Sequence, residues 1–563
     1  MKTLDWLVMG GFLLFIVTYG TWKSRGSKNV KQFLLANKST PWYTVTLSIM
    51  ATQASAITFL STPGQAYVDG MRFVQFYIGL PIAMIILSIT AVPLFHKLNV
   101  FTAYEFLEDR FDLKNRALGS ILFLIQRGLA AGFTVFAPSL ILSALLGWPI
   151  DLTILIIGIL VIIYTASGGT EAVNKTHILQ MTVIFFGMIS AFIMIFKLLP
   201  DNVSLFDAAH IAGKMGRLNT IDFSFNLSDR YTFWSGLIGG TFLALSYFGT
   251  DQSQVQRYLA GRSITQSRVG LLMNGIVKVP MQFFILFIGA MVFVFYQFAS
   301  PPLFFNPIET KNIKSSQYAT EYQELEKEYS SLHEKKTEEI DRMLTALAAE
   351  QPDKVENTQQ SILSLKVESE SIRQEAIGLI QKNNPDSDGN DTNYIFLSFV
   401  LAFLPAGLIG LVLAAILSAS MSSTSAELNA LASTSVMDIY KRIIHDKGNE
   451  RHYLIASKMA TIFWGAIAIF FALFANRLGS LVEAVNILGS LFYGTILGIF
   501  LVAFYFKKIG GHAVFIAAII AEIAVLSLYQ FTDIPYLWFN FIGCLLVVII
   551  GFICQNIIQH IKK

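Results

Sequence analysis

Residues 418–429 read Ser-Ala-Ser-Met-Ser-Ser-Thr-Ser-Ala-Glu-Leu-Asn, inside a stretch that is otherwise apolar enough to span a bilayer. Each hydroxyl in such a setting needs a hydrogen-bond partner, and small residues let a neighbouring helix approach closely. A second stretch of this kind, Ser48-Ile-Met-Ala-Thr-Gln-Ala-Ser-Ala56, lies near the other end of the chain. Two polar, small-residue interruptions in hydrophobic segments indicate a transporter binding site near the middle of a membrane.

The composition is that of a helical protein that crosses a membrane many times. Of its 563 residues, 54% are hydrophobic and 14% are charged. Apolar runs of about 20 residues, long enough to cross roughly 30 Å of hydrocarbon, recur along the chain. We predict an all-α protein with thirteen transmembrane helices, near 4–22, 42–61, 71–95, 117–146, 150–167, 176–198, 232–252, 269–298, 393–424, 454–475, 480–506, 512–531 and 536–558.

Lysine and arginine residues predict how the chain is oriented in a plasma (inner) membrane. They cluster in every second loop, from Arg25 and Lys28 in the first loop to Lys562 and Lys563 at the C-terminus. Connections such as 147–150 carry no basic residue. By the positive-inside rule, the N-terminus is expected outside and the C-terminus in the cytoplasm.

Residues 300–392 form a polar insert between the eighth and ninth predicted spans, and we expect it outside the membrane. Apolar residues recur at helical spacing along 318–347 and 362–379, with Pro352 between, so two amphipathic helices should pack as an antiparallel hairpin. The hairpin is either a solvated decoration or a docking surface for an envelope partner. The predicted domains are a leading helix and cytoplasmic loop (1–41), a transporter core (42–299 and 393–510), the insert (300–392) and two trailing helices (511–563).

Several classes of function are disfavoured by the residue types present. Residues 309–391 hold 10 basic and 18 acidic side chains, and cytoplasmic loops account for the basic excess elsewhere, so no nucleic-acid partner is expected. Cys544 and Cys554 are ten residues apart on one predicted helix, too far to bridge. The sequence contains no zinc-ligand cluster, P-loop or Gly-x-Ser-x-Gly motif. We therefore expect neither an enzyme nor an organic cofactor.

Four motifs, in the same order along the chain, resemble those of the sodium/solute symporter family, whose members include sodium/glucose cotransporters. They are Ala103-Tyr-Glu-Phe-Leu-Glu-Asp-Arg-Phe111, Tyr164-x-x-x-Gly-Gly-Thr-Glu-Ala-Val173, Gly249-Thr-Asp-Gln-Ser-Gln-Val-Gln-Arg-Tyr-Leu-Ala-Gly-Arg-Ser263 and Met437-Asp-Ile-Tyr-Lys441. The similarity covers nearly the whole chain except 300–392. It implies a leucine-transporter-type fold, in which the second to eleventh spans form two inverted five-helix repeats and the first helix of each repeat is broken.

The resemblance also implies a site for a coupling sodium ion. Its ligands would be the carbonyls of Ala51, Ala54 and Ala419 and oxygens of Ser422 and Ser423. A sodium ion needs several hard oxygen ligands, which unwound backbone and serine can supply. Ala419 and Ser422 are one helical turn apart and therefore share a face. The alternative is that these serines bond their own i−4 carbonyls and only permit tight packing.

Some members of the family bind a second sodium ion through an Asp in the fifth core helix. In this chain His177 occupies that position, and Ala426 occupies one of the hydroxyl positions. Because an imidazole cannot replace a carboxylate as a sodium ligand, we predict one sodium ion per cycle. His177 would then be either a structural histidine or a proton-sensing group.

Polar residues expected beside the broken helices form the candidate substrate site: Gln53, Ser55, Thr58, Gln75, Tyr77, Arg127, Asp251, Gln252, Lys278, Glu483 and Asn486. Arg127 lies roughly 15 Å deep in its span, where a charge costs about 2.5–3.5 kcal/mol. It either binds a substrate carboxylate or pairs internally with Asp251, Glu427 or Glu483. Lys278 falls where sugar-transporting relatives place a lysine, which favours a sugar or polyol, but Tyr77 stands where they have a carboxylate.

The sequence thus predicts a sodium-driven symporter of a small polar organic solute, working by alternating access. The solute could be a sugar, polyol, amino acid or carboxylate such as sialic acid. A single sodium ion favours a neutral or zwitterionic solute, because a monoanion carried with it moves no net charge, whereas Arg127 favours a carboxylate. The rival interpretations are a transporter-like membrane sensor or scaffold that signals through the insert, and a proton-coupled carrier.

Overall fold

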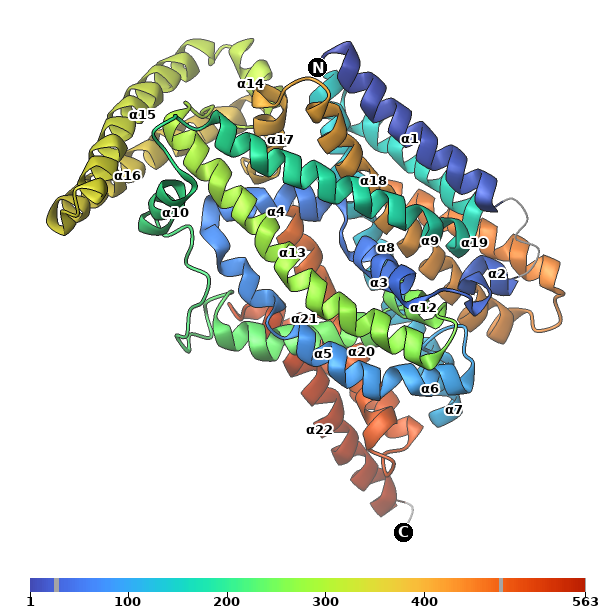
Figure 1. Ribbon diagram of the computed structural model, residues 1–563. Helices are drawn as coiled ribbons and strands as arrows, with labels where there is room; N and C mark the ends of the chain where they lie inside the picture. The colour runs from blue at the N-terminus through green and yellow to red at the C-terminus, as the bar shows by residue number, and fades with distance from the viewer. Residues whose placement is uncertain (25–29, 475–478, 562–563) are drawn as a thin grey trace.

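The computed structural model describes residues 1–24, 30–474 and 479–561, which form helices linked by connections that are mostly short, with a long one at 215–234 (Figure 1). Up to the insert, the helices are α1 (Thr3–Ser24), α2 (Val30–Leu35), α3 (Trp42–Gln53), α4 (Ala56–Asp69), α5 (Leu80–Ile89), α6 (Ala91–Leu98), α7 (Glu105–Arg110), α8 (Leu113–Leu146), α9 (Ile150–Leu198), α10 (Leu205–Lys214), α11 (Gly240–Gly249), α12 (Gln252–Leu259) and α13 (Ile264–Phe298). The others are α14 (Pro307–Lys314), α15 (Ala319–Ala348), α16 (Pro352–Asn383), α17 (Thr392–Phe403), α18 (Leu408–Thr434), α19 (Glu450–Ala472), α20 (Leu481–Tyr505), α21 (Gly511–Phe531) and α22 (Leu537–Ile561).

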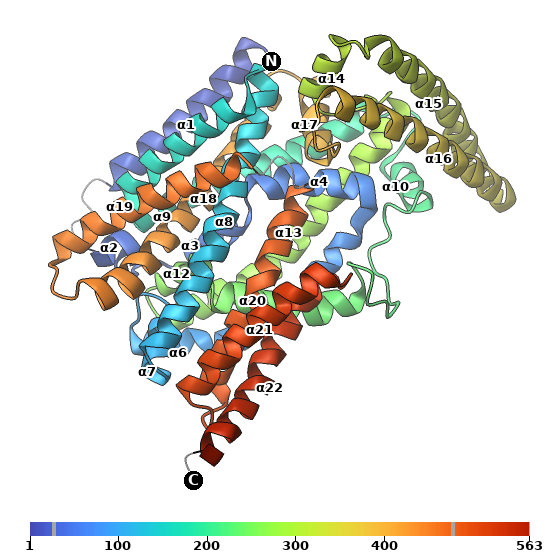
Figure 2. The same ribbon diagram turned by 180° about the vertical axis from the view of Figure 1, so that it is seen from behind.

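The helices of the described chain include nine runs long and apolar enough to cross a membrane. Helix α18 lies at the centre and packs against α1, α3, α8 and α9, while α13 packs against α3, α4 and α5. Helices α21 and α22 pack against α20 on the side away from α1 (Figure 2). The N-terminus lies near α14 and α17, and the C-terminus lies at the opposite end of the molecule (Figure 1).

Two helices are broken in the interior of the protein, at the positions expected from the resemblance. Helix α3 ends at Gln53, and extended Ser55 (φ −79°, ψ 174°) precedes the start of α4. Helix α11 ends at Gly249, and extended Asp251 (φ −76°, ψ 117°) precedes α12, with its carboxylate accepting a hydrogen bond from the Ser253 amide (2.9 Å). Each break releases backbone groups that a continuous helix would pair within itself.

The serine-rich stretch 418–429 interrupts the hydrophobic pattern of its segment but not the helix. Helix α18 continues through all of it, and its hydroxyls other than that of Ser418 find partners without disturbing the helix. Ser420 donates to the Thr134 carbonyl of α8 (2.8 Å), and Ser423 donates to the Ala419 carbonyl one turn back (3.1 Å). Hydroxyls paired in this way make the stretch polar while leaving its backbone regular.

Other predicted boundaries also differ from the structure. The span predicted at 393–424 is two helices, because Pro405 and Gly407 (φ +91°) separate α17 from α18. The spans predicted at 150–167 and 176–198 are joined by helical backbone as α9, since a drop in hydropathy does not by itself end a helix. The basic residues of 25–29 and 562–563 used to predict orientation lie outside the described residues.

The insert contains a long helical hairpin, α15 and α16, which turns at 349–351 beside Pro352 (Figure 1). Tyr322, Leu332, Ile372 and Ala376 are buried between the two helices. The hairpin also contacts the body of the protein: Thr337 donates to the Gln297 carbonyl (2.8 Å), Gln359 to the Lys214 carbonyl (2.7 Å), and Arg373 pairs with Asp391. The hairpin is therefore docked along part of its length.

Docking of the hairpin should weaken in acid because of His333, a residue of α15. Burial lowers the pKa of the His333 imidazole to about 4, below the ~6.5 of an exposed histidine. When the hairpin opens and exposes His333, the imidazole binds a proton that it does not bind in the closed state. Docking therefore weakens as the pH drops from about 6.5 to about 4. One proton changes the opening equilibrium by at most about tenfold per pH unit. Amide hydrogen exchange of α15 and α16, corrected for intrinsic rates, measures it; an unchanged pH slope in His333→Gln would contradict this assignment.

Candidate functional site

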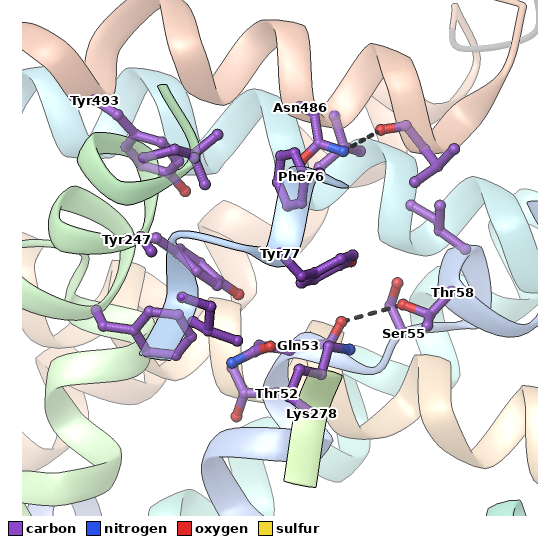
Figure 3. A pocket seen from close by; sticks show the side chains of 18 of the residues that line it. Thr52, Gln53, Ser55, Thr58, Phe76, Tyr77, Tyr247, Lys278, Asn486 and Tyr493 are labelled. Carbon is purple, nitrogen blue, oxygen red and sulfur yellow. Dashed lines mark hydrogen bonds between the residues drawn. The ribbon is translucent and has the colours of Figure 1, made fainter. Parts of the chain in front are cut away.

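A cavity of about 130 Å³ lies beside the helix breaks, enclosed by the segment 70–77 and by residues of α3, α4, α5, α8, α11, α13, α18 and α20 (Figure 3). Phe76, Leu80, Leu243, Phe248 and Val482 give it an apolar wall. Typical pockets for drug-sized ligands measure about 300–1,000 Å³, so this one suits a small solute. Seven of the predicted substrate residues line it: Gln53, Ser55, Thr58, Tyr77, Arg127, Lys278 and Asn486.

The other four predicted substrate residues lie outside the cavity lining. Gln75 donates to the Tyr231 carbonyl (2.8 Å) and accepts from the Asp222 amide (2.9 Å), so it holds an irregular segment. Gln252 does the same for residues 101–103, donating to the Phe101 carbonyl (2.8 Å). The sequence predicted the approximate depth of these side chains but not the rotation of their helices, which points them away from the cavity.

Glu483 and Asp251 lie close to the cavity, and each has other partners in the protein. Glu483 forms an ion pair with Arg230 (2.9 Å) and accepts a hydrogen bond from the Tyr231 hydroxyl (3.1 Å). Asp251 caps α12 and pairs with Arg127. Neither carboxylate belongs to the cavity surface itself.

Arg127 is held internally by two carboxylates. Its Nε donates to Asp251 (3.1 Å), its Nη1 donates to Glu427 (3.0 Å), and its Nη2 contacts both Asp251 and the Tyr493 hydroxyl. Thr134 donates to the second Glu427 oxygen (2.9 Å). Arg127 is 3% exposed, so these bonds form in a dry setting. Of the two interpretations left open by the sequence, the structure has the internal ion pair, with Asp251 and Glu427 but without Glu483.

Sequence reasoning did not place Thr134, Tyr247, Glu427 or Tyr493 in the cavity lining, although all four line it. Glu427 belongs to the serine-rich stretch 418–429. A carboxylate inside a membrane-spanning helix is expected to face a partner or a cavity, so its sequence position could have placed it here. The tyrosines are common aromatic residues in apolar helices, and their sequence surroundings gave no signal.

Two of the residues expected to bind sodium, Ala51 and Ser422, meet beside the break between α3 and α4. Ala51, Ala54, Ala419, Ser422 and Ser423 are all buried. The Ser422 hydroxyl of α18 donates to the Ala51 carbonyl of α3 (3.1 Å), which the helix break leaves without its own amide partner. These neutral oxygens are hard ligands of the kind that sodium takes, so the residues present fit the ion.

His177 is buried next to this region. Its Nδ1 lies 3.0 Å from the Ser48 hydroxyl, which donates to the Asn174 side chain (2.8 Å). The Arg257 guanidinium, also fully buried, donates to the same Asn174 oxygen (3.3 Å). No ion pair of Arg257 with a carboxylate occurs within 1–24, 30–474 and 479–561. An imidazole and an uncompensated cation make this a poor place for a second sodium ion.

Comparison with known proteins agrees with this arrangement. The model of the sodium:solute symporter family matches residues 33–325 and 383–521. The chain belongs to this family. The family and the relatives described below are transporters, which agrees with the predicted class of function and with a multi-pass membrane protein.

Two relatives illustrate the range of similarity. The sodium/sialic acid symporter NanT of Aliivibrio fischeri is 24% identical over 564 residues, which cover 99% of this chain and 94% of that protein. The sodium-coupled monocarboxylate transporter 1 of Xenopus laevis is 33% identical over 273 residues. That match covers 48% of this chain and 43% of the relative, so this chain matches less than half of the relative's length.

A solved structure shares the fold over nearly the whole chain. It is the substrate-bound, outward-open state of a Na+-coupled sialic acid symporter, with a TM-score of 0.75 and 23% identity. The match covers 99% of this chain and 98% of that one.

Replacing Arg127 should damage the protein through the charges left behind. Arg127→Met strands two buried carboxylates, and loss of one partner from a buried ion pair costs about 3–5 kcal/mol. We expect a lower thermal midpoint for the purified protein in detergent, with part of the loss recovered by adding Glu427→Gln. If Arg127→Met were as stable as the parent, the ion-pair network would not have the structural role assigned here.

Proposed function

We propose that this protein carries one sodium ion together with one small polar organic solute across the membrane by alternating access. Family membership supports sodium coupling. The observation that carries the proposal is the contact between the Ser422 hydroxyl and the Ala51 carbonyl, directly beside the helix break and the cavity. A sodium ion bound there would join α3 to α18 and so favour one arrangement of the two helices over another.

We further propose that α3–α4 and α11–α12 are equivalent broken helices that begin two inverted five-helix repeats within a thirteen-helix protein. The boundaries 42–299 and 393–510 for the core, with flanking segments 1–41 and 511–563, belong to this proposal. The two breaks, at 54–55 and 250–251, support it. So does the placement of irregular backbone beside a cavity, where membrane proteins tolerate it.

The N-terminus and the hairpin insert would lie outside the cell and the C-terminus in the cytoplasm. The position of the N-terminus near α14 and α17, at the end opposite the C-terminus, supports this orientation (Figure 1). Together with the basic loops, it would put the hairpin in the extracytoplasmic space.

We propose that two polar clusters close the routes to the cavity. On the proposed outer side, Ser480 donates to Gln65 (3.0 Å), next to the Arg230–Glu483 ion pair. On the proposed inner side, Arg116 pairs with Asp438 (2.7 Å) and Glu108 (2.9 Å). Alternating access would require each cluster to open in turn while the other stays closed.

Loss of a serine hydroxyl at the proposed sodium site should weaken sodium coupling. For Ser422→Ala or Ser423→Ala we expect the sodium concentration giving half-maximal uptake to rise about tenfold, because one such oxygen contributes roughly 1.4 kcal/mol. Ser433→Ala is the matched control, since this serine of α18 is buried and its hydroxyl has no partner in the described structure. Uptake unaffected by either change at limiting sodium would refute the site.

Uptake should depend on sodium without cooperativity. With a single ion per cycle, the Hill coefficient for sodium in proteoliposomes is expected to be about 1, since it can exceed 1 only where more than one site binds. Combining His177→Asp with Ala426→Ser supplies the missing carboxylate and hydroxyl, and should raise the coefficient above 1. A sigmoidal curve for the unmodified protein would show that the count of one ion is wrong.

A further inference from the structure

Lys278 is the one lysine in the lining of the cavity, and it is 2% exposed. In the part of the chain that is described, the Lys278 ammonium group makes no ion pair and no hydrogen bond. Its nitrogen lies 5.8 Å from the centroid of the Tyr77 ring. A lysine charge at this depth costs about 2.5–3.5 kcal/mol and is expected to face a partner or a cavity. In the described structure Lys278 faces the cavity and has no carboxylate partner.

The other charges at the cavity are already paired. All three nitrogens of Arg127 are bonded to Asp251, Glu427 or Tyr493. A solute carboxylate could bind Arg127 only by displacing one of its two carboxylate partners, which would strand a buried charge. An anion entering the cavity therefore meets Lys278 as the available cation.

Polar groups with spare hydrogen-bonding capacity share the cavity with Lys278 (Figure 3). Ser55 has no hydrogen bond recorded for its hydroxyl among the described residues, and it begins the segment after the break. The Asn486 amide nitrogen donates to the Val482 carbonyl (2.7 Å), which leaves its oxygen free to accept from a hydroxyl or amine. The Gln53 amide nitrogen lies 3.4 Å from Asn274, so the Gln53 oxygen is also free.

We propose that the transported solute is a small carboxylate whose negative group binds the Lys278 ammonium, while its hydroxyl or amine groups bond to Asn486 and Gln53. This inference rests on the proposed symport function and specifies its solute class. It assigns Lys278 to a carboxylate where a neutral sugar was the alternative. The absence of any protein carboxylate beside Lys278 in the described structure is what distinguishes the two, because a neutral sugar would leave the ammonium uncompensated.

Paired solutes that differ only in charge test this assignment. Purified protein in proteoliposomes is given a sodium gradient and radiolabelled lactate, gluconate or N-acetylneuraminate, each beside its neutral amide. We expect at least one acid to enter at least tenfold faster than its amide. Lys278→Gln should reduce that preference at least tenfold, Lys278→Arg should keep most of it, and Gln282→Leu, a change of a buried residue one turn away, should leave it intact.

The outcomes separate this inference from the function on which it rests. Sodium-driven uptake with equal rates for acid and amide, or an undiminished preference in Lys278→Gln, would overturn the role of Lys278 and leave sodium coupling standing. Preference for the acid without sodium dependence would support Lys278 and overturn sodium coupling. Thermal stabilisation of Lys278→Gln by sodium chloride, relative to choline chloride, shows that the variant is folded with its ion site intact.

Discussion

A helix that ends inside a membrane protein leaves backbone carbonyls that need partners, and the core of this protein is organised around that requirement. The break after Gln53 frees the Ala51 carbonyl, which receives the Ser422 hydroxyl of α18. The break after Gly249 leaves the Thr250 carbonyl, which receives the Tyr104 hydroxyl (2.8 Å). Because water is absent at this depth, side chains of neighbouring helices must supply these bonds. An ion or solute that offers better partners can therefore change how the helices pack.

Close packing holds the broken helices in place despite their interrupted backbones. A Cβ atom at Gly289 of α13 would lie 2.1 Å from the Pro63 carbonyl of α4, and one at Gly64 would lie 2.0 Å from the Thr392 carbonyl of α17. Glycine at these two points lets the helices touch backbone to backbone. The half-helix α4 is thus fixed against α13 and α17, and the backbone between α3 and α4 leaves the helical conformation only at 54–55.

The sequence was informative where residue type alone decides the outcome. The polar stretch 48–56 indicated the first break, the family resemblance implied a break in the first helix of each repeat, and Pro352 predicted the hairpin turn. The stretch 418–429 stays helical because its hydroxyls bond to Thr134 and Ala419, as the one-turn spacing assumed for Ala419 and Ser422 requires. Two outcomes depend on helix rotation, which packing determines: which of three candidate carboxylates would reach Arg127, and that Gln75 would turn away from the cavity.

Charge balance explains how sodium and an anionic solute would assist each other. Arg127 is outnumbered by Asp251 and Glu427, so that network has a net negative charge, whereas Lys278 and Arg257 are cations without a carboxylate partner in the described chain. Sodium alone would add a further positive charge to a region of low dielectric, where like charges repel strongly. A carboxylate bound at Lys278 would offset the positive charge that sodium adds. Binding of sodium would therefore make binding of the carboxylate more favourable, and the reverse. On this proposal, coupling would follow from electrostatics. One sodium ion and a monocarboxylate would cross together with no net charge, driven by the sodium concentration gradient and not by the membrane potential.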